Sequence, residues 1–513
     1  MGGRAKVILR SLCLGFASFA IAACGRSEDP AHARGSTVVV AVKEIDGFSP
    51  AADEIAKFLV FLPLLSYDLD GTPHPRLARA WEHSDDYREW TYRLRTDVRW
   101  HDGTPVTARD VAFTLRLLAH PAVALLGRDD IEAVVVHDDS TVTIRSPTWL
   151  SHGNDSWMVY YPEHLLKDLD PDEFRSWLFW RRPVGNGAYR FVRWVPETMM
   201  VFDANQDFFA GEPRIRQVVL KILGGAAFTE LRAGRVDAVA VPNPTQIPAF
   251  SKDPRYRLHL GVVEHVARAI YWNVSHPLFR DRRVRRALTL AMDRRETFRA
   301  LNLPDTLPIV DGPHTARQYR RRQLLDPWPH DPDRARALLE EAGWRDSDRD
   351  GIRDREGRPF RFTTIVGPDP GLAQVAVVLQ QQLREIGVQM EIQPLDRGVM
   401  GRVRSGDFEA ALVVSQHQSW WLKRYFGEGA PLGYDNPRVA RLIDRADSEA
   451  HPDSIDAAYA EMQQIFKEDL PATFLGLRTE AHFVHRRIRG LDGWWPDPLW
   501  YMDELWVEED GQR

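Results

Sequence analysis

A run of neutral polar side chains beside two tryptophans is the most prominent candidate binding segment in the sequence. It occupies Ser415–Trp421 and reads SQHQSWW. Amide and imidazole groups make directional hydrogen bonds, each contributing about 0.5–1.5 kcal/mol net, and indole rings offer flat apolar faces. This combination favours a polar ligand that is uncharged or weakly charged, such as an oligosaccharide or a blocked peptide. We therefore predict ligand contacts from Gln416, His417, Gln418, Trp420 and Trp421. The alternative is that these are polar loop side chains beside core tryptophans.

Two segments could also bind metal ions. His417 could ligate a transition metal, but one histidine without a second ligand nearby is weak evidence for such a site. Asp346–Asp354 has acids at positions 1, 3, 5 and 9 and glycine at position 6 of a calcium-loop pattern. Position 12 is Gly357 instead of a bidentate glutamate. An acidic hairpin turn is the simpler explanation, so we predict no resident metal and no cofactor, and weak calcium binding stays open.

The beginning of the chain has the pattern of a processing signal. Basic residues within the first ten precede Ser11–Ala23, an apolar stretch of 13 residues. A membrane-spanning helix needs about 20, so this stretch is typical of a signal peptide. Its end, Ile21–Cys24, resembles the lipobox of bacterial lipoproteins, which implies cleavage before Cys24 and lipid attachment to that residue. We predict a signal peptide at 1–23 and a polar tether at 24–37. The alternative is an ordinary secretory signal with a cysteine nearby by chance.

Composition and motifs exclude several functions. The net charge is −6 with a pI near 6.3, and the basic residues form no separate stripe, so we predict no nucleic-acid partner. Cys24 would be the only thiol after processing, which excludes a cysteine-dependent catalytic site and a cysteine-rich zinc site. The sequence has no G-x-S-x-G, H-E-x-x-H, P-loop or dinucleotide glycine pattern. We therefore predict that the protein is not an enzyme.

The elements that must position the candidate residues alternate between strands and helices. Val38–Val42 is a β-branched run typical of a buried strand. Trp90–Arg95 alternates large and polar residues and predicts a half-buried strand, with a second short strand around Val98–Trp100. Thr107–Asp110 predicts a capping box, and Asp331-Pro332 predicts the start of another helix. This interleaving favours an α/β fold with mixed sheets.

Six blocks of sequence, in this order, resemble the family 5 extracellular solute-binding proteins of ABC transporters, the group of oligopeptide, dipeptide and nickel receptors. The block WTYRLRTDVRWHDGTPVTARDVAFTLRL matches the most recognisable stretch of that family almost position by position. The resemblance runs from about Val38 to Trp506. The blocks are Leu64–Glu82, Trp90–Leu117, Pro183–Phe191, Ile270–Arg294, Asp331–Trp344 and Gly433–Leu442.

The resemblance implies a two-lobed, periplasmic-binding-protein-like fold of type II with an extra inserted domain. Ligand would bind between the lobes, and hinge strands near Tyr271 and Arg478 would allow closure. The implied partners are a small-molecule or peptide ligand, ABC permease subunits and, through the lipid, a bacterial membrane facing the periplasm or cell surface. The expected domains are a discontinuous lobe I at 38–56, 184–271 and 478–513, an inserted domain II at 57–183, and a lobe III at 272–477.

One departure from the family pattern bears on the ligand. In the peptide-binding members an aspartate pairs with the α-ammonium of the ligand, and aligning Gly406–Glu409 with the family pattern places that position near Gln418. Ser415–Trp421 contains no acid, and a buried ammonium without a carboxylate would cost several kcal/mol. Whether the solute is a peptide, a sugar or another molecule therefore stays open. The alternative function is a surface adhesin or an extracytoplasmic chaperone built on the same fold.

Overall fold

The computed structural model describes residues 35–43, 48, 54–67, 72–123, 131–147, 158–241, 243–491 and 502–508. The predicted signal peptide, Cys24 and most of the tether lie outside these residues. Among the helices of the described ranges, none combines the length and the apolar composition that crossing a bilayer requires.

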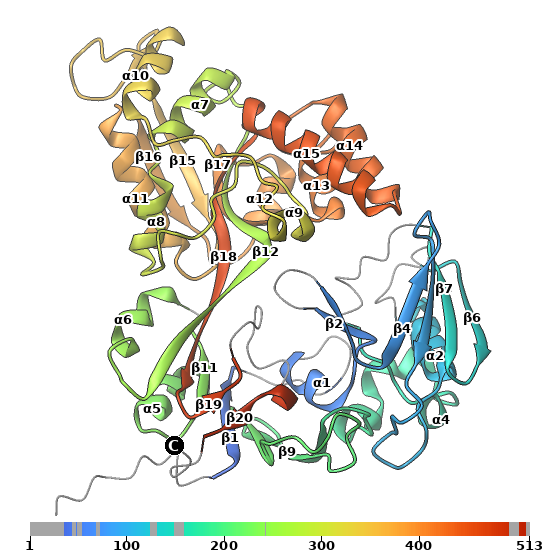
Figure 1. Cartoon of the computed structure of the whole chain (residues 1–513). Coiled ribbons are helices and arrows are strands. Elements are labelled where there is room, and N and C mark those ends of the chain that lie inside the picture. The colour runs from blue at the N-terminus through green and yellow to red at the C-terminus, as the bar shows by residue number, and fades with distance from the viewer. Residues whose placement is uncertain are drawn as a thin grey trace, which may run out of the picture.

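A mixed sheet of ten strands runs through the molecule (Figure 1), in the order β16-β15-β17-β12-β18-β11-β1-β10-β9-β8. Its pairs β1–β10, β1–β11, β15–β16 and β15–β17 are parallel, and the others are antiparallel. The strands are β1 (Thr37–Val42), β8 (Tyr189–Val195), β9 (Met199–Ala204), β10 (Gln217–Ile222), β11 (Ala238–Ala240), β12 (Tyr256–Trp272), β15 (Arg361–Val366), β16 (Gln389–Pro394), β17 (Ala410–Gln416) and β18 (Ala472–His485).

Two long strands connect the two lobes of the molecule. β12 has 17 residues and β18 has 14, and they pair antiparallel along most of their length. Figure 1 shows them running from the lower part of the molecule, which contains β1 and β8–β11, into the upper part, which contains β15–β17. We call the lower strands with their helices lobe I and the upper ones lobe III.

The sheet of lobe III is covered on both faces. One hydrophobic cluster lies on the side of α7, α8, α10 and α11, and another on the side of α12 to α15, because alternate residues of β12 and β17 point to opposite faces. The helices of this lobe are α7 (Arg282–Ala291), α8 (Arg294–Ala300), α9 (Ala316–Arg320), α10 (Pro332–Glu341), α11 (Leu372–Glu385), α12 (Val399–Ser405), α13 (Ser419–Phe426), α14 (Pro437–Ser448) and α15 (Pro452–Asp469). A small hairpin pairs β13 (Asp354–Arg355) with β14 (Arg358–Pro359).

A smaller antiparallel sheet and its helices form a further unit, which we call domain II. Its strand order is β4-β5-β7-β6, and one hydrophobic cluster joins it to the strands of lobe I. A Cβ atom at Gly185 would lie 1.9 Å from the carbonyl oxygen of Val60, so only glycine permits this approach of the two backbones. The elements are α1 (Glu54–Val60), β2 (Leu65–Tyr67), β3 (Pro73–Pro75), β4 (Ala78–His83), β5 (Glu89–Leu94), α2 (Ala108–Ala119), β6 (Ala133–Asp138), β7 (Thr141–Arg145) and α4 (Glu163–Leu166).

The C-terminal segment returns to lobe I and secures its first strand. Arg487 and Asp237 form an ion pair whose side chains are both fully enclosed, and Asp237 also accepts the backbone N–H of Val39. Arg487 donates in addition to the carbonyls of Gly35 and Thr37. The remaining elements of this lobe are α5 (Ala227–Arg232), α6 (Ile247–Phe250), β19 (Ile488–Arg489) and β20 (Trp506–Val507).

Most of the elements predicted from the sequence are present. The strand at Val38–Val42 is β1, Asp110 accepts the backbone N–H of Thr107 at the start of α2, and Asp331 caps α10. The predicted strand around Val98–Trp100 is wrong, because that segment forms only an isolated bridge between Arg99 and Pro105. Proline has no N–H to donate, so the ladder cannot continue there.

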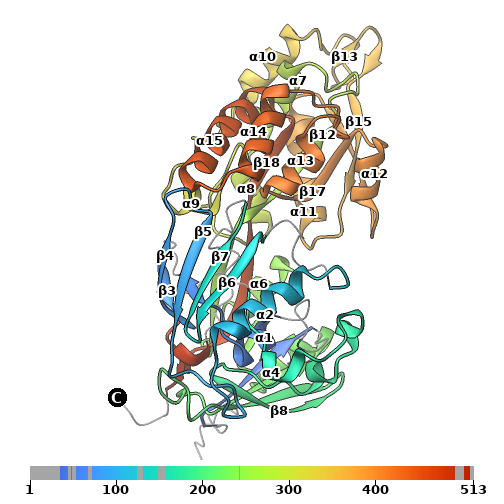
Figure 2. The same ribbon diagram turned by 90° about the vertical axis from the view of Figure 1, so that its right-hand side faces the viewer.

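Domain II also touches lobe III, on the side away from the hinge strands. Tyr87, at the turn between β4 and β5, packs edge-on against His451 at the start of α15, with ring centroids 4.8 Å apart. Both views place this hairpin next to one end of α15 (Figures 1 and 2). Lobe III is thus joined to the rest of the molecule by β12 and β18 on one side and by this aromatic contact on the other.

Candidate functional site

β12 is irregular where it passes between the lobes. Val263 pairs with Arg478 of β18 and Ala267 pairs with Leu477, so the three residues between Val263 and Ala267 have no counterpart on β18. Bulges of this kind bend a strand and redirect its side chains, and they are frequent beside functional sites. Here the bulge presents Glu264 and His265 at the level where the two lobes meet.

Glu264 is the buried acid of this region. Its side chain is 2% exposed and accepts the Nε–H of Arg320, from α9, with both carboxylate oxygens 2.9 Å away. Burial raises the pKa of Glu264 to about 7, although the charge of Arg320 opposes this rise. The carboxylate therefore has a cationic partner within the protein itself.

Three histidines from distant parts of the chain come together beside this pair. The backbone N–H of His417 donates to the carbonyl of His265, and the rings of His314 and His417 meet edge-on with centroids 4.6 Å apart. Burial lowers the pKa of His314 to about 4 and also lowers the pKa of His265 and His417. All three imidazoles are therefore neutral near pH 7, so each offers one donor and one acceptor.

The polar run predicted from the sequence lies at the end of β17 and the start of α13. Gln416 is the last residue of β17, and Gln418 is the N-terminal cap position of α13, although its side chain caps no backbone N–H. Both ring nitrogens of His417 and Oε1 of Gln418 are enclosed and have no hydrogen-bond partner among the described residues. Most buried polar atoms are hydrogen-bonded in folded proteins, so these atoms are candidates for contact with a ligand.

The two predicted tryptophans point in different directions. Trp420 is 52% exposed. Trp421 lies against Tyr425, and its Nε1–H donates to the hydroxyl of Tyr271, which in turn donates to Ser415 Oγ. Trp420 is thus free to contact a solute, whereas Trp421 fixes the position of the strand that bears the polar run.

The structure brings the acids of the predicted calcium segment together. Carboxylate oxygens of Asp346, Asp348 and Asp350 lie within 4.8 Å of one another, and all three residues are exposed. Asp346 accepts the N–H of Gly351, while Asp348 and Asp350 each accept a backbone N–H two residues further on. Such hydrogen bonds from carboxylates to nearby backbone N–H groups are the ones expected for an acidic hairpin turn, the alternative to a calcium loop.

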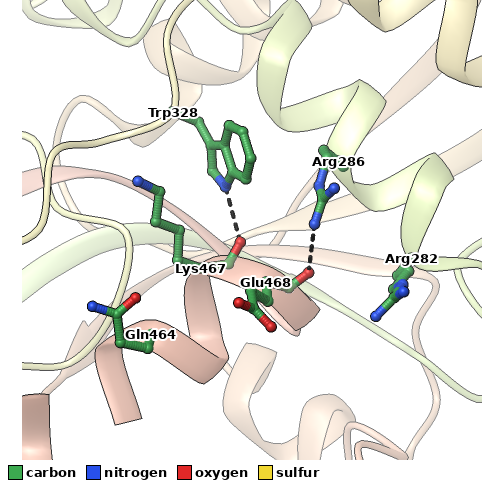
Figure 3. A pocket seen from close by; sticks show the side chains of 6 residues that line it. All are labelled: Arg282, Arg286, Trp328, Gln464, Lys467 and Glu468. Carbon is green, nitrogen blue, oxygen red and sulfur yellow. Dashed lines mark hydrogen bonds between the residues drawn. The ribbon is translucent and has the colours of Figure 1, made fainter. Parts of the chain in front are cut away.

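A pocket of about 390 Å³ lies on lobe III, between α7 and the end of α15 (Figure 3). Trp328 and Arg286 donate to the carbonyls of Lys467 and Glu468 in the last turn of α15. The neighbouring Arg285 donates to the carbonyls of Asp469 and Leu470. Arginines of α7 therefore supply hydrogen-bond donors to the carbonyls at the end of α15, which is an interhelical contact.

Sequence reasoning missed the residues that β12, α9 and the loop before α9 contribute to the hinge region. β12 reads YRLHLGVVEHVARAIYW, and Glu, His and Arg interrupt a strand whose last seven residues are buried. Charged residues in a buried strand break the apolar pattern expected there, and this signal was available from the sequence. The missed residues are Glu264, His265, Arg268, His314 and Arg320.

Comparisons with known proteins agree with this architecture. A family model described as bacterial extracellular solute-binding proteins, family 5 middle, matches residues 72–426. The oligopeptide-binding protein AppA of Bacillus subtilis is 25% identical over 460 residues, covering 82% of this chain and 83% of AppA. The nickel-binding periplasmic protein of Escherichia coli is 24% identical over 395 residues, 71% of each chain. The crystal structure of NikZ from Campylobacter jejuni in complex with Ni(L-His) superposes with a TM-score of 0.71 at 23% identity, covering 92% of this chain and 99% of NikZ.

These relatives are binding proteins rather than enzymes, as predicted for this chain. The solved structures also confirm the α/β, two-lobed fold of type II. Because the family model covers more than half of its length, the chain belongs to family 5 of the bacterial extracellular solute-binding proteins.

Proposed function

We propose that this protein is the substrate-binding lipoprotein of an ABC importer, which captures a peptide-like or other polar solute between lobes I and III and delivers it to the permease. The observation that carries the proposal is the bulge of β12, which holds polar side chains where the lobes meet. The proposed boundaries are lobe I at 38–56, 184–271 and 478–513, domain II at 57–183 and lobe III at 272–477. The two boundaries between lobe I and lobe III, at 271/272 and 477/478, fall within β12 and β18 respectively.

The polar run supports solute capture at this place. His417 and Gln418 leave enclosed polar atoms without partners, each at a cost of about 1–3 kcal/mol. A solute that supplies these partners stabilises the arrangement in which both lobes enclose it. Binding then shifts the population toward the closed state, which is the signal that a permease can read.

The nature of the solute follows partly from the acids nearby. The curated relatives include an oligopeptide-binding and a nickel-binding protein, so a peptide-like solute is one candidate. Glu264, the acid beside the polar run, is already paired with Arg320. A free α-ammonium would therefore compete with Arg320 for this carboxylate, which favours a blocked peptide, an oligosaccharide or another polar solute.

A thermal-shift screen of the mature protein against peptides, oligosaccharides and metal chelates tests the proposal. A ligand at 100 times its dissociation constant adds about 2.7 kcal/mol to the free energy of unfolding. We expect at least one class to raise the melting temperature. Two results together would replace this proposal with the adhesin or chaperone alternative. The first is that no class of compound binds. The second is that deletion of the gene leaves solute uptake unchanged but impairs attachment of the cells or folding of other proteins.

The lipid anchor is tested separately. Changing Cys24→Ser removes the thiol that would receive the lipid and should leave the precursor uncut by the lipoprotein peptidase. Metabolic labelling with a fatty acid is the measurement. Label that persists in the variant would contradict anchoring through Cys24 without affecting the assignment of solute binding.

A further inference from the structure

Arg268 differs from the other buried arginines in the described part of the chain. It lies on β12, is 4% exposed, and its Nε and Nη1 are enclosed without a hydrogen-bond partner. The other five buried arginines each donate to a carboxylate or a backbone carbonyl. They are Arg76, Arg285, Arg294, Arg353 and Arg487.

The charges around Arg268 do not neutralise it. Asp369, which follows β15, attracts the guanidinium but forms no ion pair with it, and Arg478 of β18 adds a second positive charge. Burial lowers the pKa of Arg268, since the charged form is the one that loses hydration. A buried cation without a partner is costly, so its donors need an acceptor that the described residues do not supply.

The position of Arg268 links it to one residue of the candidate site, Gln416. Arg268 pairs with Val414 of β17, and Val266 pairs with Gln416. Side chains two residues apart on a strand share a face, so Arg268 and Gln416 project from the same face of the β12–β17 pair. Arg268 also follows the bulge of β12 directly, within the crossing between the lobes.

We propose that Arg268 binds an anionic group of the solute, a carboxylate or a phosphate, with Gln416 donating to the same end of the ligand. The inference rests on the proposed solute capture between the lobes and narrows its ligand class. A guanidinium matches the geometry of both anions through two parallel N–H donors. An uncharged solute leaves Arg268 without an acceptor, so the site discriminates against it. The polar run considered alone favours an uncharged ligand, whereas the polar run together with Arg268 favours a polar ligand that has an anionic group at one end.

Probe pairs that differ by one anionic group test the inference. Calorimetry on the full mature protein compares tripeptides with their C-terminal amides, glucose 6-phosphate with glucose, and inorganic phosphate with chloride, together with the best ligands of the thermal-shift screen. We expect the anionic member of a pair to bind at least about tenfold more tightly, as expected for a hydrogen bond to a charged group. The pair that shows the preference distinguishes a carboxylate ligand from a phosphate ligand.

The variant Arg268→Met removes the donors while keeping an apolar chain of similar length. The preference should disappear, and the melting temperature of the ligand-free variant should equal or exceed that of the unmodified protein because an unpaired buried charge is gone. Arg193→Met, at an exposed position of β8, is the matched control and should keep the preference.

Two results would overturn the inference while solute capture stands. One is a best ligand without any anionic group. The other is a preference for the anionic probe that survives Arg268→Met. The contradiction would be strongest if the variant without ligand also melted several degrees below the unmodified protein, because that is the result expected when a structural contact with Asp369 is lost. Failure of every probe and every screened compound to bind would instead remove the proposed function, and this inference with it.

Discussion

Glu264 introduces a pH-dependent term into the stability of the hinge region. Burial disfavours the carboxylate and raises the pKa of Glu264 in the folded protein to about 7, above its ordinary value of 4.5. The stabilising contribution of the protonated group is therefore complete below about pH 4.5 and is lost as the pH rises through 7. Because the side chain is only 2% exposed, solvent screens this effect little, and we expect the free energy of unfolding to fall by about 3 kcal/mol over this pH range.

Glu264→Gln should abolish this pH dependence, since the amide does not titrate. Arg320 then lacks its carboxylate partner at every pH, which changes the absolute stability but not its slope. Urea unfolding between pH 4.5 and 8 measures the effect, and Glu132→Gln, at an exposed position, is the control. Parallel pH profiles for the unmodified protein and Glu264→Gln would contradict the raised pKa.

Gln418→Asp should change the ligands that the polar run accepts. The position begins α13 without a side-chain cap, and its Oε1 is enclosed and unpartnered. An aspartate there can cap the helix and can also pair with an ammonium group, so affinity for cationic amines should rise. Calorimetry with free and N-acetylated tripeptides is the measurement. Tight binding of free tri- to pentapeptides to the unmodified protein would show that another acid already accepts the α-ammonium.

At the scale of elements, the ion pair of Asp237 and Arg487 holds together segments that no local interaction joins. It connects the residue before β11 with the chain after β18, and Asp237 also accepts the N–H of Val39 in β1. Arg487→Met leaves Asp237 buried without its cation and should lower the free energy of unfolding by about 3–5 kcal/mol. Arg489→Met, which removes a partly exposed pair with Glu508, should cost about 0–1 kcal/mol. Equal costs for the two variants would contradict the importance of burial.

Elements defined by local pattern were predictable from the sequence. The β-branched run of β1, the capping residues of α2 and the Asp-Pro start of α10 each depend on neighbours within a few positions. The segment at Val98–Trp100 has strand-like residues, but its partner across the turn is Pro105, which cannot extend a ladder. Local propensity therefore predicted the helices and long strands better than this short pairing.

The candidate site was predictable only in part, because its members come from separate segments. Gln416, His417 and Gln418 are adjacent in sequence, and their composition alone marked them. His314 reaches His417 from more than 100 positions away, and Glu264 reaches the same region through a bulge of β12. A bulge depends on the register between β12 and β18, which is a property of the tertiary structure and leaves no local signal.

For the whole molecule, the hinge strands β12 and β18 predict a change of shape on binding, because they are the strands that join lobe I to lobe III. The contact of Tyr87 with His451 joins domain II to lobe III on the other side. Ligand should therefore shift an open ensemble toward a more compact one. Small-angle scattering with and without the best screened ligand should show a smaller radius of gyration in its presence.

Tyr87→Ala provides a matched variant for the scattering experiment. It removes the aromatic contact without touching the polar run, so the ligand should still bind but compaction should be smaller and dissociation faster. An unchanged radius in the unmodified protein, with binding confirmed by calorimetry, would mean that the lobes are rigid and that the permease recognises another feature.

The link between Arg487 and the carbonyl of Gly35 spans 452 positions and has a consequence for biogenesis. β1 pairs with β10 and β11, which follow it early in the chain, but Arg487 reaches the carbonyls of Gly35 and Thr37 only from beyond β18. Closing so long a loop is entropically costly and slow, so we expect this contact at the start of β1 to form late in folding. The start of the first strand is thus secured by an arginine from the far end of the fold.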